Sequence, residues 1–228
     1  MRGVALDRVA LALPFRGTWL ARNSPARRVP SHGTDLFATT YAMDFVAVRG
    51  RRTATVRDWR ALLSTEPVDR FYAFGQPVLA PAAGRVVAVF DGRSDEVARR
   101  SVVAKVPYAL TQATRVRAGA GAIAGNHVVL ALPDGGAHVL LAHLRAGSVR
   151  VRVGDVVTTG DQIGSCGNSG NSTQPHLHIQ AMDGPDAYVA TGLPMAFRSY
   201  RAWRRRGARP VEVAEGVPRE SEVVEALT

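Results

Sequence analysis

The chain has 228 residues, 46% of them hydrophobic, which suits a soluble globular protein that buries a sizeable core. It contains 29 Lys and Arg residues against 19 Asp and Glu residues, so its formal net charge is +10. This charge favours contact with polyanions such as nucleic acid, acidic lipid or anionic cell-wall polymers, and composition does not choose among them. Because Lys105 is the only lysine, the excess of arginine can equally reflect the nucleotide composition of the source.

Simple counts exclude several classes of protein. The single cysteine, Cys166, excludes an internal disulfide and a cysteine-rich metal site. No apolar run approaches the roughly 18 residues of a membrane span, so we expect no transmembrane segment. Residues 1–8 make a poor signal peptide because Asp7 and Arg8 interrupt their apolar part. We therefore expect no export signal in these residues.

The first quarter of the chain is predicted to contain two strands separated by a loop. Residues 1–16 form a short apolar segment of the kind found in an edge strand. Residues 17–31 are rich in turn-forming residues, so His32 is expected to project from a loop. Residues 41–48 have the composition of a strand, and Asp44 stands in it between large apolar neighbours.

The pattern from residue 75 onward is that of a mostly β protein with long loops and little helix. Short apolar runs separated by Gly and Asp predict an antiparallel sheet or sandwich. The predicted strands lie within residues 75–90 (two short runs), 126–132, 138–144, 149–153 and 161–164. Residues 50–70 are expected to form an inserted loop with a helical turn, and residues 92–124 a long surface loop of the kind that often forms a binding wall.

We expect one main domain with an extension at each end. Residues 1–31 are predicted to be an N-terminal extension that packs on the core, residues 32–200 the main domain, and residues 201–228 a C-terminal tail. The tail begins with a basic run and becomes mixed in charge from Glu212. Its last ten or so residues are expected to be loosely held.

A pair of histidines in residues 175–180 is the most informative local pattern. In an extended strand successive side chains point to opposite faces, so His176 and His178 emerge together while Leu177 and Ile179 enter a core. Two imidazoles are therefore predicted to share one wall of a cleft.

Three upstream residues turn this pair into a candidate metal site. Together with the pair, His32, Asp44 and His143 supply the nitrogen and oxygen ligands of a catalytic zinc site, which uses three protein ligands and leaves a position for water. Such a site also needs groups that accept the proton of the water and stabilise the oxyanion, and histidines that do not bind the metal can do either. His143 and His176 are the candidates for those roles.

The order His32, Asp44, His143, Pro-His-Leu-His at 175–178, with Gly-Asn-Ser-Gly-Asn-Ser-Thr at 167–173, resembles the lysostaphin-like (LytM-type) zinc endopeptidases that cut peptidoglycan peptides. The resemblance covers roughly residues 17–200, so it makes the main domain a zinc peptidase domain of the lysostaphin-like fold.

The resemblance also implies roles for individual residues. It makes His32, Asp44 and His178 the ligands of Zn²⁺, and His143 and His176 the catalytic histidines. It further implies peptidoglycan peptides as substrate and a location in the cell envelope or outside the cell.

The carboxylate ligand has two candidates, because the family's usual short spacing points to Asp35 rather than Asp44. Asp35 is predicted to lie in a turn, where its carboxylate reaches water or a backbone amide at little cost. Asp44 is predicted to lie mid-strand, where an ionised carboxylate is costly unless it is paired or bound to a metal. We therefore predict Asp44 as the ligand.

The remaining histidines and the cysteine are predicted to be structural. His127 and His138 are explained by strand positions that face solvent or a backbone carbonyl. Cys166 is expected to be a small buried side chain rather than a nucleophile. The glycine-rich residues 164–173 lack the ending of a phosphate loop and are predicted to shape the cleft beside His176.

Three other functions remain as alternatives. The chain could be a catalytically silent family member that acts as a cell-envelope binding or regulatory module, although all five site positions are filled. Residues 153–164 resemble the hairpin of lipoyl or biotinyl carriers, but Lys105 lies outside it. Binding to nucleic acid rests on charge alone, with no recognisable motif, so no specific nucleic-acid partner is expected.

Overall fold

The computed structural model describes residues 8–56, 58, 60–101, 123–133, 136–205 and 207–227. Strands dominate these residues, and the named helices are short: α1 (Arg60–Leu63) and the 3₁₀ helices η1 (Leu36–Tyr41) and η2 (Val68–Arg70). The predicted mostly β class is therefore confirmed. Within the same described ranges, no helix is long and apolar enough to cross a membrane.

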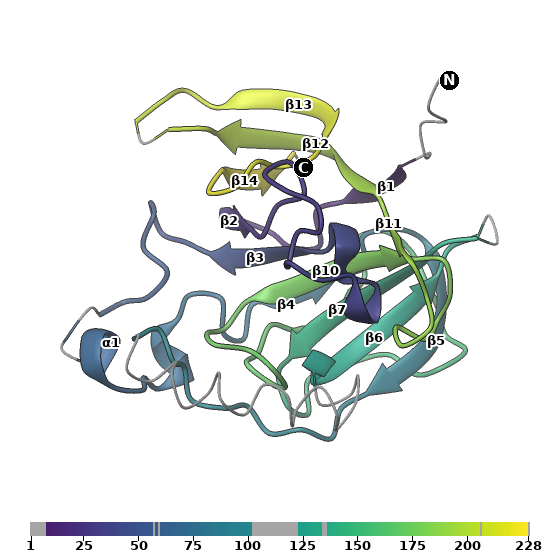
Figure 1. The fold of residues 1–228 in the computed structure, drawn as a ribbon, viewed down its shortest axis with the longest axis horizontal. Helices are drawn as coiled ribbons and strands as arrows, with labels where there is room; N and C mark the ends of the chain where they lie inside the picture. Colours follow the sequence, from purple (N-terminus) through teal and green to yellow (C-terminus); the bar gives the residue numbers. More distant parts are fainter. Residues whose placement is uncertain are drawn as a thin grey trace.

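Fourteen strands make up the described fold (Figure 1). In chain order they are β1 (Val9–Ala12), β2 (Trp19–Arg22), β3 (Met43–Ala47), β4 (Pro77–Leu79), β5 (Gly84–Phe90), β6 (Asn126–Ala131), β7 (His138–Leu144), β8 (Val156–Val157), β9 (Gln162–Ser165), β10 (Leu177–Met182), β11 (Gly192–Leu193), β12 (Met195–Trp203), β13 (Val211–Gly216) and β14 (Val223–Ala226).

Twelve of these strands form one large sheet in the order β1-β12-β14-β2-β3-β10-β7-β6-β5-β8, with β11 beside β10 and β13 beside β12. Strands β4 and β9 form a separate two-stranded sheet. The expectation of an antiparallel sheet needs one correction, because β1 and β12 pair in parallel and the sheet is therefore mixed.

One face of the large sheet packs into the main core. Met43 and Phe45 of β3 and Leu177 and Ile179 of β10 are fully buried in one cluster, which also contains Ile163 of β9. This alternation is what an extended strand imposes, since neighbouring side chains leave opposite faces. It leaves Asp44 and His178 on the other face of the sheet.

The structure corrects two further expectations, one for residues 149–153 and one for the C-terminal residues. Residues 149–153 do not form a strand. Arg150 N donates one hydrogen bond to Ile163 O, and Arg152 N donates to Asp155 Oδ2 in a turn. The end of the chain is not loosely held, since β14 lies between β12 and β2 and buries Val223 and Val224. The proposed limits of the extension, main domain and tail stay a prediction.

Two predicted insertions are only partly described. The segment 50–70 carries α1 and η2, which fits the expected helical turn, but Trp59 lies outside the described residues. Most of the expected long loop at 92–124, including Lys105, also lies outside them. Where it is described, this loop donates from Glu96 N to Asn168 O.

Candidate metal centre and cleft

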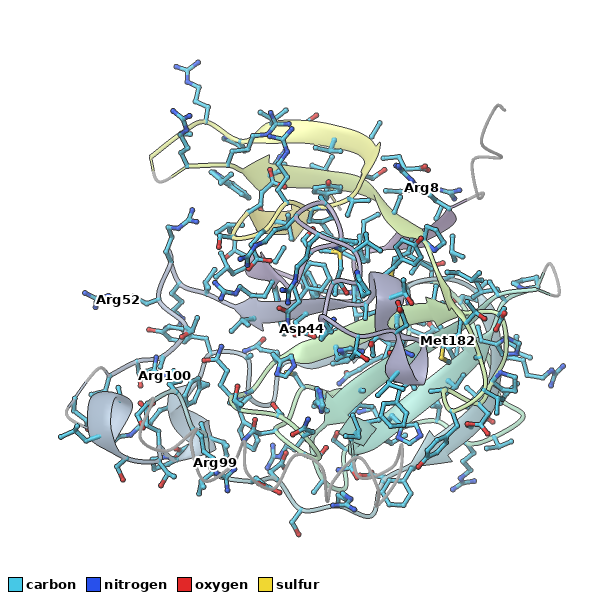
Figure 2. All side chains as sticks on the ribbon, in the orientation of Figure 1. Arg8, Asp44, Arg52, Arg99, Arg100 and Met182 are labelled. Carbon is cyan, nitrogen blue, oxygen red and sulfur yellow. The ribbon has the colours of Figure 1, made fainter. Side chains whose placement is uncertain are left out.

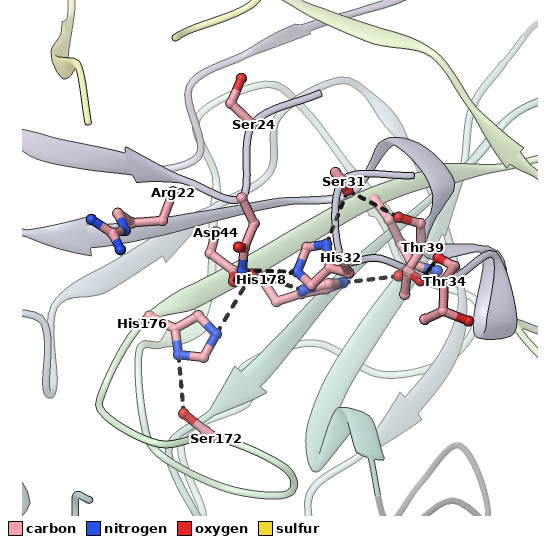
Figure 3. Close-up of polar contacts among 12 residues, drawn as sticks. Arg22, Ser24, Ser31, His32, Thr34, Thr39, Asp44, Ser172, His176 and His178 are labelled. Carbon is pink, nitrogen blue, oxygen red and sulfur yellow. Dashed lines mark hydrogen bonds and ion pairs between the residues drawn. The ribbon is translucent and has the colours of Figure 1, made fainter. Parts of the chain in front are cut away.

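The sheet register brings two of the predicted metal ligands together. Strands β3 and β10 are antiparallel neighbours in which Asp44 stands directly opposite His178. Their side chains therefore leave the same face of the sheet, and His178 Nδ1 lies 2.9 Å from Asp44 Oδ1. His32, from the loop before η1, places Nε2 at 3.3 Å from Asp44 Oδ2 (Figure 3). The three ligand atoms lie within 4.8 Å of one another.

The two predicted catalytic histidines stand beside this group. The ring centroids of His143 and His176 are 4.6 Å apart, and those of His143 and His178 are 5.8 Å apart. His176 Nε2 lies 3.6 Å from Asp44 Oδ1. All five predicted residues line one cleft of about 260 Å³, so the structure brings together every site residue expected from the sequence.

His143 reaches the cleft only because the backbone of β7 is irregular there. Ala142 lies opposite His178 and lines the cleft, so regular alternation would direct His143 into the core. Instead His143 has a left-handed backbone with φ of 61°, and Leu144 takes the core position. This conformation costs a non-glycine residue roughly 1–3 kcal/mol and is concentrated at functional sites.

Hydrogen bonds fix which nitrogen of His32 carries a proton. Ser31 Oγ donates to Thr39 O at 3.1 Å, so it accepts a hydrogen bond from His32 Nδ1 at 3.0 Å. His32 Nε2 is then left with its lone pair, directed at the Asp44 carboxylate. Asn23 Nδ2 contacts both groups, at 2.6 Å from Asp44 Oδ2 and 3.4 Å from His32 Nε2.

Gln180 sets the protonation of His178 in the same way. Gln180 Nε2 donates to Phe37 O at 2.8 Å, which turns its Oε1 towards His178 Nε2 at 2.9 Å. Because Oε1 can only accept, His178 carries a proton on Nε2, and in the neutral ring the lone pair of Nδ1 is directed at Asp44.

This arrangement is the test of whether the residues fit a metal ion. When both rings are neutral, two imidazole lone pairs and a carboxylate converge in a buried space, where acceptors repel one another unless a proton or a metal ion lies between them. Nitrogen and oxygen donors in this number suit Zn²⁺ with one position left for water. The residues present therefore fit a zinc ion.

The cleft histidines are oriented by backbone carbonyls. His143 Nδ1 donates to Ser169 O at 2.9 Å, and His176 Nδ1 donates to Gln174 O at 2.8 Å. Nε2 of each ring is therefore left to face the cleft. Ser169 and Gln174 belong to the segment between β9 and β10, and Asn171 and Thr173 of that segment also line the cleft. The prediction that this glycine-rich loop shapes the cleft is confirmed.

The environment separates the pKa values of the two cleft histidines. Burial, reinforced by the positive charges of His176 and His178, holds the pKa of His143 well below its usual 6.5. Burial also opposes the charged form of His176, but the nearby Asp44 carboxylate outweighs it and raises the pKa of His176. Burial would raise the pKa of Asp44 itself, yet the charges and hydrogen bonds of the surrounding histidines lower it well below 3.8.

The residues predicted to be structural lie outside this cleft. The Asp35 carboxylate accepts from Thr40 Oγ1 at 2.9 Å and is not part of the ligand group. His127 Nδ1 donates to Gly125 O, and neither His127 nor His138 lines the cleft. Cys166 is buried in the main core, and this burial raises the pKa of its thiol.

Sequence reasoning missed three supporting residues. Gln180 could have been found, because it lies two positions after His178 and therefore on the same face of the strand. Ser31 and Asn23 lie in loops, and no periodic pattern connects them with Asp44 or with the proton on His32.

Part of the chain matches a known protein family. The model of Peptidase family M23 matches residues 104–189, which include His143, His176 and His178. The chain is thus similar to peptidase family M23 over residues 104–189, which we call the M23 segment. The family resemblance inferred from the sequence is thereby confirmed for this M23 segment, which excludes His32 and Asp44.

Solved structures of M23-type proteins resemble the chain in outline. The catalytic domain of the antimicrobial peptidase lysostaphin from Staphylococcus simulans is 22% identical, with 67% of this chain and 74% of that one covered and a TM-score of 0.38. A variant of the catalytic domain of the prophage-encoded M23 protein EnpA from Enterococcus faecalis is 18% identical, with 67% and 73% covered and a TM-score of 0.39. A putative glycyl-glycine endopeptidase lytM from Ruminococcus gnavus is 16% identical, with 67% and 42% covered and a TM-score of 0.36.

Proposed function

We propose that this M23-family chain is a zinc-dependent endopeptidase that hydrolyses peptide bonds in the stem or cross-bridge peptides of peptidoglycan. One observation carries the proposal: the proton-free sides of His32 and His178 face the Asp44 carboxylate in a cleft that two further histidines share. A cluster of acceptors with this geometry is stabilised by a divalent cation.

The three ligands are proposed to be His32 Nε2, His178 Nδ1 and the Asp44 carboxylate. When bound there, Zn²⁺ would supply a water of lowered pKa, near 7, and an electrophile for the substrate carbonyl. Ser31 and Gln180 would keep the two imidazoles in the tautomers that bind a metal, because each holds the proton on the opposite nitrogen.

His143 and His176 are proposed to carry the proton chemistry. Both hold Nδ1–H on a carbonyl and present Nε2 to the cleft, which is the arrangement needed to accept, hold and return a proton at one atom. His143 favours the neutral form and suits the base. His176 favours the protonated form beside Asp44 and suits the donor that stabilises a developing oxyanion.

The lining of the cleft supports a small uncharged peptide as substrate. Half of its described lining outside the histidines is apolar, including Phe37, Leu140 and Ala187, and the polar half is uncharged apart from Asp44. A charged side chain would lose its hydration against such walls without gaining a partner. Peptidoglycan as the source of the peptide rests on the resemblance to the LytM-type enzymes.

The deciding experiment combines metal analysis with digestion of isolated cell walls. Purified protein in zinc-replete buffer is expected to hold about one zinc per chain and to release new amino termini from the walls. A chelator should abolish the release and added zinc should restore it. The control is His143→Ala, which should hold zinc and release nothing. Folded protein without zinc would contradict the metal site, and zinc-loaded protein without activity would favour a binding or regulatory module.

A further inference from the structure

A second hollow lies away from the cleft, where the turn after β3 meets the ends of β12 and β14. Its volume is about 630 Å³, and we call it the basic groove. It is lined by Thr18, Arg49, Gly50, Arg51, Arg52, Trp203, Arg205, Gly207 and Val223. Figure 2 shows Arg52 beyond the end of β3, well separated from Asp44.

The arginines of the basic groove sit on a fixed frame. Arg49 and Arg52 exchange backbone hydrogen bonds of 3.0 and 3.2 Å, and Gly50 supplies the positive φ of 64° that this tight turn requires. Arg51 Nη2 donates to Ser221 O at 2.6 Å, and the Arg49 guanidinium lies 4.8 Å from the centre of the Tyr72 ring. The side chains of Arg49 and Arg51 are therefore held in place by these contacts.

Among the described residues, the groove arginines lack the carboxylate partners that neighbouring arginines have. Four arginines on the adjoining strands and loops each pair with a glutamate at 3.2 to 3.5 Å: Arg22 with Glu220, Arg198 with Glu215, Arg201 with Glu212 and Arg204 with Glu222.

In the part of the chain that the structure describes, no carboxylate lies within 4.0 Å of the four groove arginines, and none lines the groove. Four like charges in one hollow repel one another, and this cost is removed by an external anion. The missing partner is therefore expected to be a ligand.

We propose that the basic groove binds phosphodiester groups of an anionic cell-wall polymer of the poly(glycerol phosphate) type. This inference rests on the proposed function, which places the substrate in the wall. A guanidinium presents a planar set of donors that matches two phosphate oxygens at once, so a row of arginines suits a chain of regularly spaced phosphates.

The groove is less suited to single-stranded nucleic acid. Proteins that bind such strands offer successive aromatic rings on which bases stack, and each stacked base contributes about 1–3 kcal/mol. Among the described residues that line the groove, Trp203 is the one aromatic side chain. A polymer without bases needs no aromatic rings for stacking, so a groove with one aromatic side chain can bind it equally well.

The position of the groove allows both sites to be occupied together. Arg49 follows Asp44 by five positions, of which the first three lie in β3, so the two residues are separated by at most about 16 Å at roughly 3.3 Å per residue. Polymer in the groove would hold the cleft against the wall without touching the catalytic histidines. The expected result of losing the groove is weaker attachment with unchanged peptide hydrolysis.

The test measures binding of a synthetic poly(glycerol phosphate) oligomer by calorimetry. Arg52→Ala/Arg205→Ala should weaken binding by roughly tenfold or more, because two phosphate contacts are lost. The matched control, Arg150→Ala/Arg152→Ala, removes the same charge from exposed residues outside the groove and should stay within about twofold. Arg52→Lys/Arg205→Lys should fall between wild type and the alanine variant, because lysine keeps the charge and loses the two-point contact.

Two results would overturn the proposal. Equal losses in the groove and control variants would show attraction to net charge alone. Tighter binding of single-stranded DNA with the same number of phosphates would assign the groove to nucleic acid. Hydrolysis of a soluble peptide is measured separately on the same samples. A protein that binds the oligomer specifically but cleaves no peptide would refute the proposed function and would still support phosphodiester binding in the basic groove.

Discussion

The two walls of the cleft are built in different ways. On one wall, Asp44 and His178 face each other because β3 and β10 are regular strands in register. On the other wall, His143 needs a left-handed residue within β7, and His176 is oriented by a carbonyl of the glycine-rich loop. The first wall directs ring nitrogens at the carboxylate, whereas the second presents the Nε2 atoms of His143 and His176 to the cleft, where each can gain or lose a proton. In the proposed mechanism, metal binding and proton transfer would therefore belong to different walls and should be separable by mutation.

Removing the carboxylate should have the largest effect and tests the first wall directly. Asp44→Asn is expected to weaken zinc binding by orders of magnitude, because the two imidazoles lose the anion that faces them. Asp35→Asn should change the affinity by only a few-fold, since Asp35 bonds to Thr40 away from the site. Competition with a chelator measures both affinities. The reverse ranking would move the ligand to Asp35.

The second wall should lose activity while keeping the metal. His143→Ala and His176→Ala are each expected to lower kcat by about 10²- to 10⁴-fold, as is typical for loss of a general acid or base, with most of the zinc retained. His178→Ala should release the zinc instead. Zinc content and peptide hydrolysis are measured on the same samples. If His176→Ala emptied the site as completely as His178→Ala, the assignment within the pair would be wrong.

Gln180 offers a smaller test of how the first wall is held. Gln180→Leu removes the acceptor of the His178 Nε2 proton and should weaken zinc binding by about 10- to 100-fold, the usual cost of losing such a partner. Gln180→Glu keeps an acceptor oxygen and should lose less. The control is the exposed Gln76→Leu, which should bind zinc normally. Equal affinities for wild type and Gln180→Leu would show that Gln180 does not orient the ligand.

The pH dependence of the metal-free protein probes the second wall with the smallest expected effect. The pKa of His143 is lowered in the folded state, so below about pH 6.5 the unfolded chain binds a proton that the folded chain does not. Acid therefore favours unfolding, by at most about 1.4 kcal/mol per pH unit for one group. His176 contributes in the opposite direction, because its raised pKa stabilises the fold below pH 6.5 and that stability is lost as the pH rises.

The measurement is urea unfolding in the presence of a chelator at pH 7.5 and pH 5.5, values chosen to lie on either side of about pH 6.5. His143→Gln, which cannot be protonated, should lose less stability on acidification than wild type. An unchanged dependence on pH would show that His143 is not the group that titrates.

The difference between the walls also explains what the sequence could predict. Alternation in β3 and β10 correctly placed Asp44 and the histidine pair on the cleft face, with Met43 and Leu177 in the core. Alternation alone would have sent His143 into the core, because the irregular residue in β7 has no sequence signal. His143 was identified from the motif it belongs to rather than from its strand position.

The C-terminal strands show a different limit of sequence reasoning. In β12, exposed arginines alternate with buried residues such as Phe197 and Tyr200, and the predicted tail, residues 201–228, begins within this strand. The pairing partners that make these residues a sheet lie far away in sequence: β12 pairs with β1, and β14 pairs with β2. Local patterns carry no information about such pairings.

The insertion of β14 between β12 and β2 has a consequence for how the protein folds. Val223 pairs with Leu20, so residues near opposite ends of the described chain must meet before the sheet is continuous. Contacts between such distant residues form slowly, because the entropy of closing a large loop is lost before the contact repays it. Strand β2 in turn borders β3, the strand that carries Asp44. Zinc uptake is therefore expected to lag behind the initial collapse of the chain, and the ion could serve as a reporter of the last folding step.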